Sequence, residues 1–314
     1  MPKRKVSGSS AAKRGVMAIL SPAKTLDLSP IDEEGISLEW TYPDVDADKT
    51  KTIAKILKSK EQSQLAKLLN ISTKLAATAH RYWSDFQYHV DGQNDTNESS
   101  MKPSIFSFSG AAYQGLDIAT CSQDDLLYLQ DSLRIIDPLY GVLRPLDLMQ
   151  PYRLEMATKK VFPEDKTVKL AEYWREAVTA RLAQDLSDND RTVTQRVLLN
   201  LASDEYSAAV DANALPSDAS YVKVVFRQEG RIIAVHAKRA RGLMVRYLAQ
   251  NNVDDLDGVK DFNLEGYTFQ EDESDETTLV FDREKPETNT TGKNKTETTS
   301  KKGSNGRKRA KSKN

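Results

Sequence analysis

Short apolar runs alternate with longer helical segments, and this alternation constrains the fold of the chain most strongly. Val16–Leu20 and residues 197–201 are apolar runs of strand length, which predicts two buried strands. Residues 47–88 carry apolar side chains at helical spacing, and residues 170–186 predict a further capped helix. Because strands and helices interleave without an internal repeat, we expect a mixed α/β fold.

Three further segments have a local signature. Ser122 and Asp125 match a capping box, which predicts the start of a helix. Residues 104–109 alternate in polarity, which predicts a strand. Residues 221–227 and 231–237 flank a glycine-containing turn, so they predict a β-hairpin.

Charge divides the chain into three parts. Residues 1–14 hold five basic and no acidic residues, and residues 284–314 hold ten basic and three acidic residues. Residues 15–283 then hold 30 basic and 43 acidic residues, a net charge of -13. We therefore expect one folded domain over residues 15–283 between two disordered basic tails. The tails resemble nuclear-import signals or nucleic-acid-binding arms, and solubilising tails are the alternative.

Composition excludes several classes of protein. Cys121 is the only cysteine, which excludes an intramolecular disulfide and multi-cysteine metal ligation and suits a reducing compartment. No apolar run approaches the ~20 residues of a membrane span, and no secretory signal follows the basic N-terminus. We expect a cytoplasmic protein, with entry to the nucleus through the tails as a further possibility, and no membrane contact.

The sequence favours no metal site. The three histidines, His80, His89 and His236, form no closely spaced pair. The acidic run over residues 271–276 suits a solvated loop better than a metal site. We therefore predict no structural metal and no cofactor.

One segment contrasts with the acidic body, because residues 231–253 contain no acidic residue. At 100° per residue, one helix face there gathers apolar side chains, namely Ala240, Leu243, Met244, Tyr247 and Leu248. The other face gathers Lys238, Arg239, Gly242 and Arg246, with Arg241 on its flank. Guanidinium groups on one face suit the phosphates of a nucleic acid, and Gly242 would let a ligand backbone approach. The alternative is a solvated face on which Gly242 serves close packing.

Prolines interrupt residues 133–156 at Pro138, Pro145 and Pro151. Short turns and helices are therefore expected instead of one long helix. Glycine-containing turns of this kind can direct N–H groups at phosphate, as in helix-hairpin-helix elements, with Arg144 and Arg153 in support. The alternative is a buried crossover in which Arg144 pairs with Asp147 and Arg153 with Glu155.

Ser21 follows the first predicted strand, as a candidate helix N-cap with Pro22 in the first helical position. Ser21 and Lys24 also match the S-x-x-K pattern of serine acyl-transferring enzymes, although no K-T-G sequence follows. An enzyme acting on a nucleotide, a damaged base or another anionic small molecule would draw first on Ser21, Lys24, Asp204, Glu205 and Tyr206. Asp204 and Glu205 could equally cap a helix.

Four motifs in order, over residues 20–26, 139–156, 200–206 and 237–246, resemble the peroxide-stress resistance protein YaaA family. The resemblance implies a cytoplasmic protein that protects cells from hydrogen peroxide by limiting free iron and thereby damage to DNA. It implies a family-specific mixed α/β fold with a helix-hairpin-helix element and a basic groove for duplex DNA. It implies no established catalytic reaction.

The resemblance carries candidate groove or phosphate contacts onto matching positions: Lys24, Tyr140, Gly141, Arg144, Arg153, Lys238, Arg239, Arg241, Gly242 and Arg246. Two positions depart from the family. Asp137-Pro138 stands where relatives usually have Ser-Gly, and residues 110–113 lack the aspartate of Gly-Asp-x-Tyr.

Our leading hypothesis is noncatalytic, sequence-independent binding of duplex DNA, with no obligate protein partner. The enzyme described above is the alternative.

Overall fold

The computed structural model describes residues 15–31, 38–87, 101–187 and 195–285. The chain divides into the units Met1–Glu284 and Lys285–Asn314, and every described element lies in the first. Residues 1–14 and 286–314, which make up nearly all of the two predicted tails, lie outside the described residues, as does His89.

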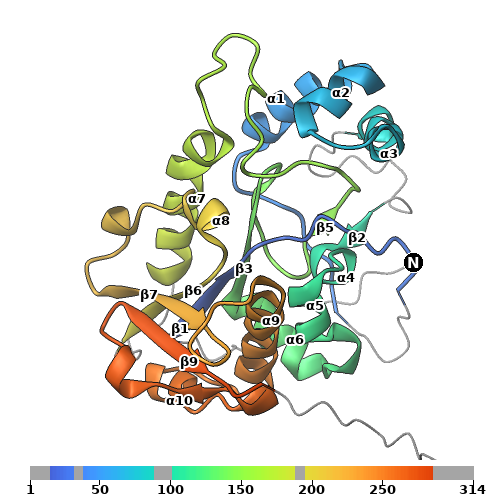
Figure 1. The fold of residues 1–314 in the computed structure, drawn as a ribbon. Coiled ribbons are helices and arrows are strands. Elements are labelled where there is room, and N and C mark those ends of the chain that lie inside the picture. The colour runs from blue at the N-terminus through green and yellow to red at the C-terminus, as the bar shows by residue number, and fades with distance from the viewer. Residues whose placement is uncertain (1–14, 32–37, 88–100, 188–194, 286–314) are drawn as a thin grey trace, which may run out of the picture. The chain divides into compact units, whose positions relative to one another are not determined.

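A seven-stranded sheet forms the centre of the first unit (Figure 1), in the order β4-β3-β1-β6-β7-β9-β8. The inner five strands run parallel, and β4 and β8 pair antiparallel at the two edges. The strands are β1 (Val16–Leu20), β3 (Leu133–Asp137), β4 (Gly141–Leu143), β6 (Arg196–Leu201), β7 (Ala219–Phe226), β8 (Thr268–Phe269) and β9 (Thr278–Asp282). A separate pair joins β2 (Lys102–Pro103) to β5 (Leu148–Met149).

Helices cover the sheet and extend beyond it. They are α1 (Ala47–Lys58), α2 (Gln62–Leu69), α3 (Thr73–Asp85), α4 (Ser104–Ser107), α5 (Ala111–Leu116), α6 (Gln123–Ser132), α7 (Leu170–Ser187), α8 (Asp204–Ser207), α9 (Ala234–Gln250) and α10 (Leu256–Lys260). Short 3-10 helices occur at η2 (Ile118–Thr120), η3 (Ala212–Ala214), η4 (Leu264–Gly266) and η5 (Glu271–Glu273). No helix of the described residues is long and apolar enough to cross a membrane.

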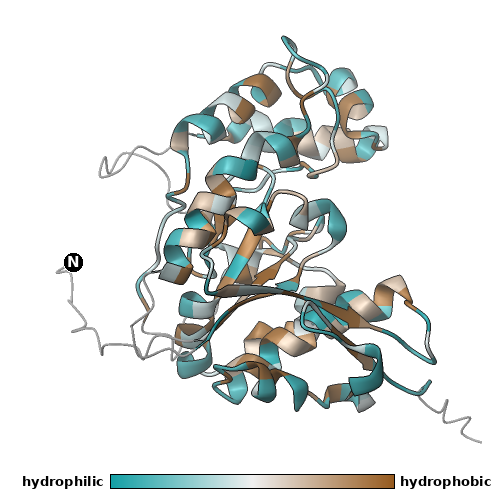
Figure 2. Cartoon of the chain, turned by 90° about the vertical axis from the view of Figure 1, so that its left-hand side faces the viewer, coloured by the Kyte–Doolittle hydropathy of each residue, from teal (hydrophilic) through white to brown (hydrophobic). Residues whose placement is uncertain are grey.

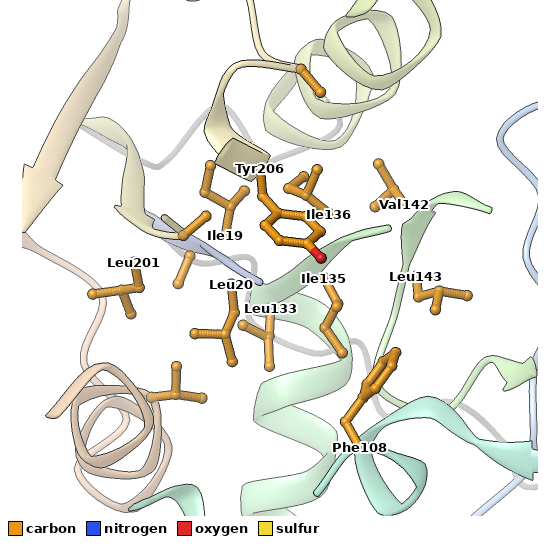
Figure 3. Packing of buried hydrophobic residues seen from close by; sticks show 14 of the residues in the cluster. Ile19, Leu20, Phe108, Leu133, Ile135, Ile136, Val142, Leu143, Leu201 and Tyr206 are labelled. Carbon is orange, nitrogen blue, oxygen red and sulfur yellow. The ribbon is translucent and has the colours of Figure 1, made fainter. Parts of the chain in front are cut away.

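Both faces of the sheet are buried. Figure 3 shows Ile19 and Tyr206 on one side of β1 and Leu20 and Phe108 on the other. Parallel strands covered on both faces consist almost wholly of apolar residues, which explains why β1 is a continuous apolar run and why β6 is mostly apolar. Each fully buried aliphatic side chain contributes roughly 1.5–3 kcal/mol to stability. Hydrophobic residues accordingly concentrate in the strands (Figure 2).

The predicted mixed α/β fold is confirmed. The runs at Val16–Leu20 and residues 197–201 form β1 and most of β6, and the described part of residues 47–88 forms three helices, α1 to α3. Helix α7 covers the predicted residues 170–186. The capping box is present at α6, where Ser122 is the N-cap.

Two predicted strands are wrong. Residues 104–109 begin with α4, because the buried Ser104 hydroxyl donates to the carbonyl oxygens of Arg144 and Pro145 and fixes the segment there. The predicted second hairpin strand instead leads into α9, which begins at Ala234. Strand β7 already pairs with β6 on one side and β9 on the other, so a hairpin strand has no free edge to pair with.

Residues 133–156 form strands β3, β4 and β5, so this segment does not form the expected helix-hairpin-helix element. Asp137 of the Asp137-Pro138 departure closes the turn between β3 and β4 by accepting the N–H groups of Leu139 and Tyr140. Gly141 completes the turn with a φ of +76°. Ser21 also caps no helix, because the chain after β1 runs as a loop to a bridge between Leu26 and Phe108.

Candidate anion-binding site

The order of the strands reverses between β1 and β6. The chain leaves β1 toward β3, its neighbour on one side, whereas β6 continues to β7 on the other side. In open α/β sheets, ligands bind beyond the carboxyl ends of the strands at such a switch point. The loops that follow β1 and β6 meet at this point. Ser203 donates its N–H to Ser21 Oγ at 2.9 Å, and the hydroxyl oxygens of the two serines lie 3.4 Å apart.

Lys24 and Arg153 are brought together beside this contact. Lys24 Nζ lies 2.5 Å from Glu155 Oε2, and Arg153 Nη2 lies 3.7 Å from Glu155 Oε1. Arg153 also donates to the carbonyl oxygen of Lys24 at 3.0 Å. Both predicted contacts therefore share one carboxylate, which is the ion pairing that the sequence offered as the alternative for Arg153.

The loop after β6 contributes two carboxylates. Asp204 accepts a hydrogen bond from Lys223 Nζ at 2.8 Å, which lowers the pKa of the Asp204 carboxyl. Glu205 Oε1 accepts the N–H of Ala157 at 2.9 Å, linking this loop to the segment after Arg153. Asp204 and Glu205 lie in the first turn of α8, where Ser203 is the N-cap, so neither is the cap itself.

Arg241 completes the site from α9. Burial lowers the pKa of its guanidinium, and the nearby charge of Asp204 opposes this shift. We call the assembled group the switch-point cluster; its members are Ser21, Lys24, Arg153, Glu155, Ser203, Asp204, Glu205, Lys223 and Arg241.

The remaining cations of α9 differ in their partners. Arg239 pairs with Glu265 at 2.7 Å, and Arg246 pairs with Asp117 at 3.4 Å. Lys238 is exposed and makes no ion pair with a residue that the structure describes. Arg239 and Arg246 are thus largely neutralised by acids from other segments of the chain.

Gly242 does not lie on an exposed cationic face, and that expectation is wrong. It is buried against α5, where an added Cβ would lie 1.6 Å from the carbonyl oxygen of Ala112. The glycine serves close packing of the two helices, as the alternative proposed. A ligand backbone cannot approach it.

Tyr140 and Gly141 are also buried, so they are unsuited to contact a ligand. A Cβ on Gly141 would lie 2.8 Å from the Trp174 ring. Arg144 pairs with Asp147 at 3.5 Å, as the alternative for this residue proposed. Of the ten candidate contacts, the switch-point cluster includes Lys24, Arg153 and Arg241.

The serine–lysine pair of the enzyme hypothesis is not assembled. The Lys24 amine lies on Glu155, and Ser21 Oγ is engaged by Ser203. Tyr206 is buried, and burial raises the pKa of its hydroxyl far above the usual range, so it is a poor proton donor or acceptor near neutral pH.

A buried carboxyl lies beneath the cluster. Asp137 accepts a hydrogen bond from the Tyr152 hydroxyl, and burial raises the pKa of the Asp137 carboxyl to about 6. Tyr113 donates to the carbonyl oxygen of Ser21 at 3.1 Å. These buried polar groups hold the loops at the ends of β1 and β3 in place.

A cavity of about 620 Å³ lies to one side of the cluster, and it shares no residue with it. Its lining is mainly apolar and includes Leu26, Trp40, Tyr82, Phe86, Met101 and Pro151.

In the described part of the chain, no three His, Cys, Asp or Glu side chains are close enough to hold a metal ion.

Sequence reasoning missed Ser203 and Lys223. A usable signal exists for Ser203, because Ser21 and Ser203 both follow closely after an apolar run of strand length. Strands of that kind are typical of parallel sheets, whose carboxyl ends share one edge. Lys223 lies within β7 and carries no such local signal.

Comparison with known proteins gives one consistent result. A family model described as peroxide stress protein YaaA matches residues 16–273. A UPF0246 protein of Chromobacterium violaceum is 40% identical over 278 residues, covering 86% of this chain and 100% of the relative. UPF0246 proteins of Burkholderia mallei and a Psychrobacter species are 39% and 36% identical, each over 85% of this chain and 98% and 97% of their own lengths.

Proposed function

Because this chain belongs to the peroxide stress protein YaaA family, we propose that it protects DNA from peroxide by binding the phosphate backbone of the duplex. The family supports the role in peroxide stress. Binding of DNA and a link to iron are our proposal.

One observation carries the proposal. Lys238 and Arg241 stand three residues apart on α9, so they are neighbours on one helix face, and neither has an ion-pair partner within the described ranges. Arg239 and Arg246 of the same helix are paired. The two unpaired cations are free to neutralise phosphates, whereas the paired ones would first have to leave a carboxylate.

Lys24 and Lys223 of the switch-point cluster can add to the cationic surface of Lys238 and Arg241 only by leaving a carboxylate, as Arg239 and Arg246 would. The side chains of Lys24 and Lys223 are 58% and 43% exposed, so a phosphate that displaces the carboxylate can reach them. Since residues 15–283 carry a net charge of -13, contact with DNA must stay local to this surface. Cations on backbone phosphates compete with iron for the same oxygen atoms, which offers a physical link to iron-dependent damage.

Direct reduction of peroxide by a thiol has no support. Burial raises the pKa of the Cys121 thiol to about 11, so the thiol stays protonated near neutral pH. Cysteines that react with peroxide carry a lowered pKa, because the thiolate is the nucleophile. The enzyme alternative keeps the residues of the switch-point cluster but lacks an assembled nucleophile and base.

The test is a salt titration of duplex DNA binding by the full chain. The variant Lys238→Ala/Arg241→Ala is compared with wild type, and Arg239→Ala/Arg246→Ala is the matched control on the same helix. Each phosphate contact adds about 0.9 to the slope of log affinity against log salt. We expect the first variant to lose about 2 units of slope and the control to lose less. Equal slopes in wild type and Lys238→Ala/Arg241→Ala would refute the proposal.

A further inference from the structure

We propose that the switch-point cluster is a binding site for a phosphomonoester dianion, with Arg241 as its anchor. The inference rests on the proposed cationic surface. It names the chemical group that Arg241, the most buried cation of that surface, recognises. The preferred group is a terminal phosphate, as on a mononucleotide or at a nucleic-acid end, which should bind more tightly than the diester of a continuous strand.

Arg241 lacks the partner that a buried charge requires. Within the part of the chain that the structure describes, five arginines have a buried Nε without a hydrogen-bond partner: Arg144, Arg153, Arg196, Arg241 and Arg283. Four of these also form an ion pair, with Asp147, Glu155, Asp218 and Glu265 respectively. Arg241 forms none, although burial lowers the pKa of its guanidinium. Because buried charges are normally paired, an anionic ligand is the missing partner.

The nearby carboxylates do not fill that role. Asp204 is the acid whose charge reaches Arg241, yet its carboxylate is already bonded to Lys223 at 2.8 Å. Glu155 is shared by Lys24 and Arg153, and Glu205 accepts a backbone N–H. The four cations of the cluster outnumber its three carboxylates, so the site retains a positive charge.

Arg241 is held in place by backbone contacts. Its neighbour Gly242 packs on the carbonyl oxygen of Ala112 in α5, and Gly115 of α5 packs on the backbone of α9. Helix α5 in turn joins the loop after β1, because the Tyr113 hydroxyl bonds to the carbonyl oxygen of Ser21. The backbone that carries Arg241 is therefore fixed relative to the loop after β1, so no backbone ordering is needed when Arg241 binds a ligand.

The remaining groups favour phosphate. Ser21 Oγ and Ser203 Oγ lie 3.4 Å apart, and only one of them can donate to the other. One hydroxyl hydrogen therefore stays available for a ligand. A guanidinium, an ammonium and a hydroxyl together match the several oxygen atoms of a phosphate. A terminal phosphate exposes three such oxygens and has one substituent, so it offers a half-buried arginine one more oxygen and less steric hindrance than a diester between two nucleosides does.

The test uses the full chain and two blunt duplexes of one sequence that differ only in having phosphate or hydroxyl groups at their 5′ ends. We expect the phosphorylated duplex to bind about tenfold more tightly at equal salt, the gain from one charged hydrogen-bonded contact. Arg241→Gln should abolish this ratio. Lys238→Ala should weaken binding of both duplexes equally. The overall affinity for DNA therefore tests the proposed function, and the ratio of the affinities for the two duplexes tests this inference.

Small probes distinguish a free nucleotide from a nucleic-acid end as the source of the phosphate. Competition by deoxyadenosine monophosphate and inorganic phosphate against the phosphorylated duplex, with no effect on the hydroxyl duplex, would support the site. Direct binding of these probes that is lost in Arg241→Gln would assign the site to free nucleotides. Equal affinity for the two duplexes without competition by either probe would overturn the inference, and so would equal competition by succinate.

Discussion

At Gly242 the backbones of α9 and α5 come into direct contact. A Cβ at this position would lie 1.6 Å from the carbonyl oxygen of Ala112, and one at Gly115 would lie 2.2 Å from that of Arg239. Such distances require a backbone to move, because neither neighbour is a flexible side chain. Two glycines therefore set the distance between the helices and fix the position of Arg241.

Gly242→Ala should destabilise the protein, although alanine favours an isolated helix by about 1 kcal/mol. We expect a loss of about 2 kcal/mol or more in the free energy of unfolding, measured with urea, because overpacking costs about 1–3 kcal/mol. Gln250→Ala at the exposed end of α9 is the control and should change little. Unchanged stability of Gly242→Ala would contradict the close contact.

Asp137 makes stability depend on pH through its burial. Its pKa in the folded protein is about 6, above the ordinary value of 3.8, because burial disfavours the charged form more than the hydrogen bonds from Tyr152, Tyr140 and Leu139 favour it. A group whose pKa is raised on folding stabilises the protein fully below its unfolded pKa. That contribution is lost as the pH rises through about 6.

Asp137→Asn should remove this dependence. Relative to wild type, the free energy of unfolding of the variant should rise between pH 4 and pH 7, by up to roughly 3 kcal/mol at about 1.4 kcal/mol per pKa unit. Urea unfolding of both proteins across this range provides the measurement. Parallel profiles would show that Asp137 does not titrate in this window.

At the level of the element, α6 shows how a local pattern fixes a boundary. Ser122 Oγ accepts the N–H of Asp125 at 3.2 Å, and Asp125 Oδ2 accepts the N–H of Ser122 at 2.8 Å. The two residues thus satisfy N–H groups that a helix start leaves free. The helix then leads directly into β3, so this boundary also positions the strand.

Ser122→Ala should cost about 1 kcal/mol of stability, because one capping acceptor is lost. Ser122→Thr keeps the hydroxyl oxygen and should stay within a few tenths of a kcal/mol of wild type. Thermal unfolding followed by circular dichroism compares the two. An equal effect of both substitutions would assign the loss to packing rather than to the cap.

For the whole molecule, the separation of charge along the chain decides how DNA binding is shared between the terminal segments and the folded body. Residues 15–283 carry a net charge of -13, whereas residues 1–14 and 284–314 together carry +12. The terminal segments therefore attract a polyanion over the same distances at which the body repels it. Nuclear import through the basic segments stays a prediction.

Removal of residues 1–14 and 284–314 should weaken DNA binding and make its salt dependence shallower, because 15 basic residues are lost. The affinity that remains should depend on Lys238 and Arg241. Anisotropy titrations at several salt concentrations, with and without Lys238→Ala/Arg241→Ala in the shortened chain, test this. A shortened chain with an undiminished slope would place all phosphate contacts in the body.

Local patterns in the sequence determined several elements of this protein. The apolar runs predict β1 and much of β6, the capping box predicts α6, and the acid-free segment predicts the basic helix α9. These features depend on side-chain spacing and on hydrogen bonds between residues close in the chain. They are therefore readable without knowledge of the neighbours in space.

Only the tertiary structure decided which cations are free. Arg239 and Arg246 are paired with acids 26 and 129 residues away, whereas the adjacent Lys238 and Arg241 have no such partner in the described residues. Ser21 and Ser203 meet across 182 residues because β1 and β6 are neighbours in the sheet. An ion pair or a shared site requires distant segments to come together, and spacing along one helix does not encode which segments those are.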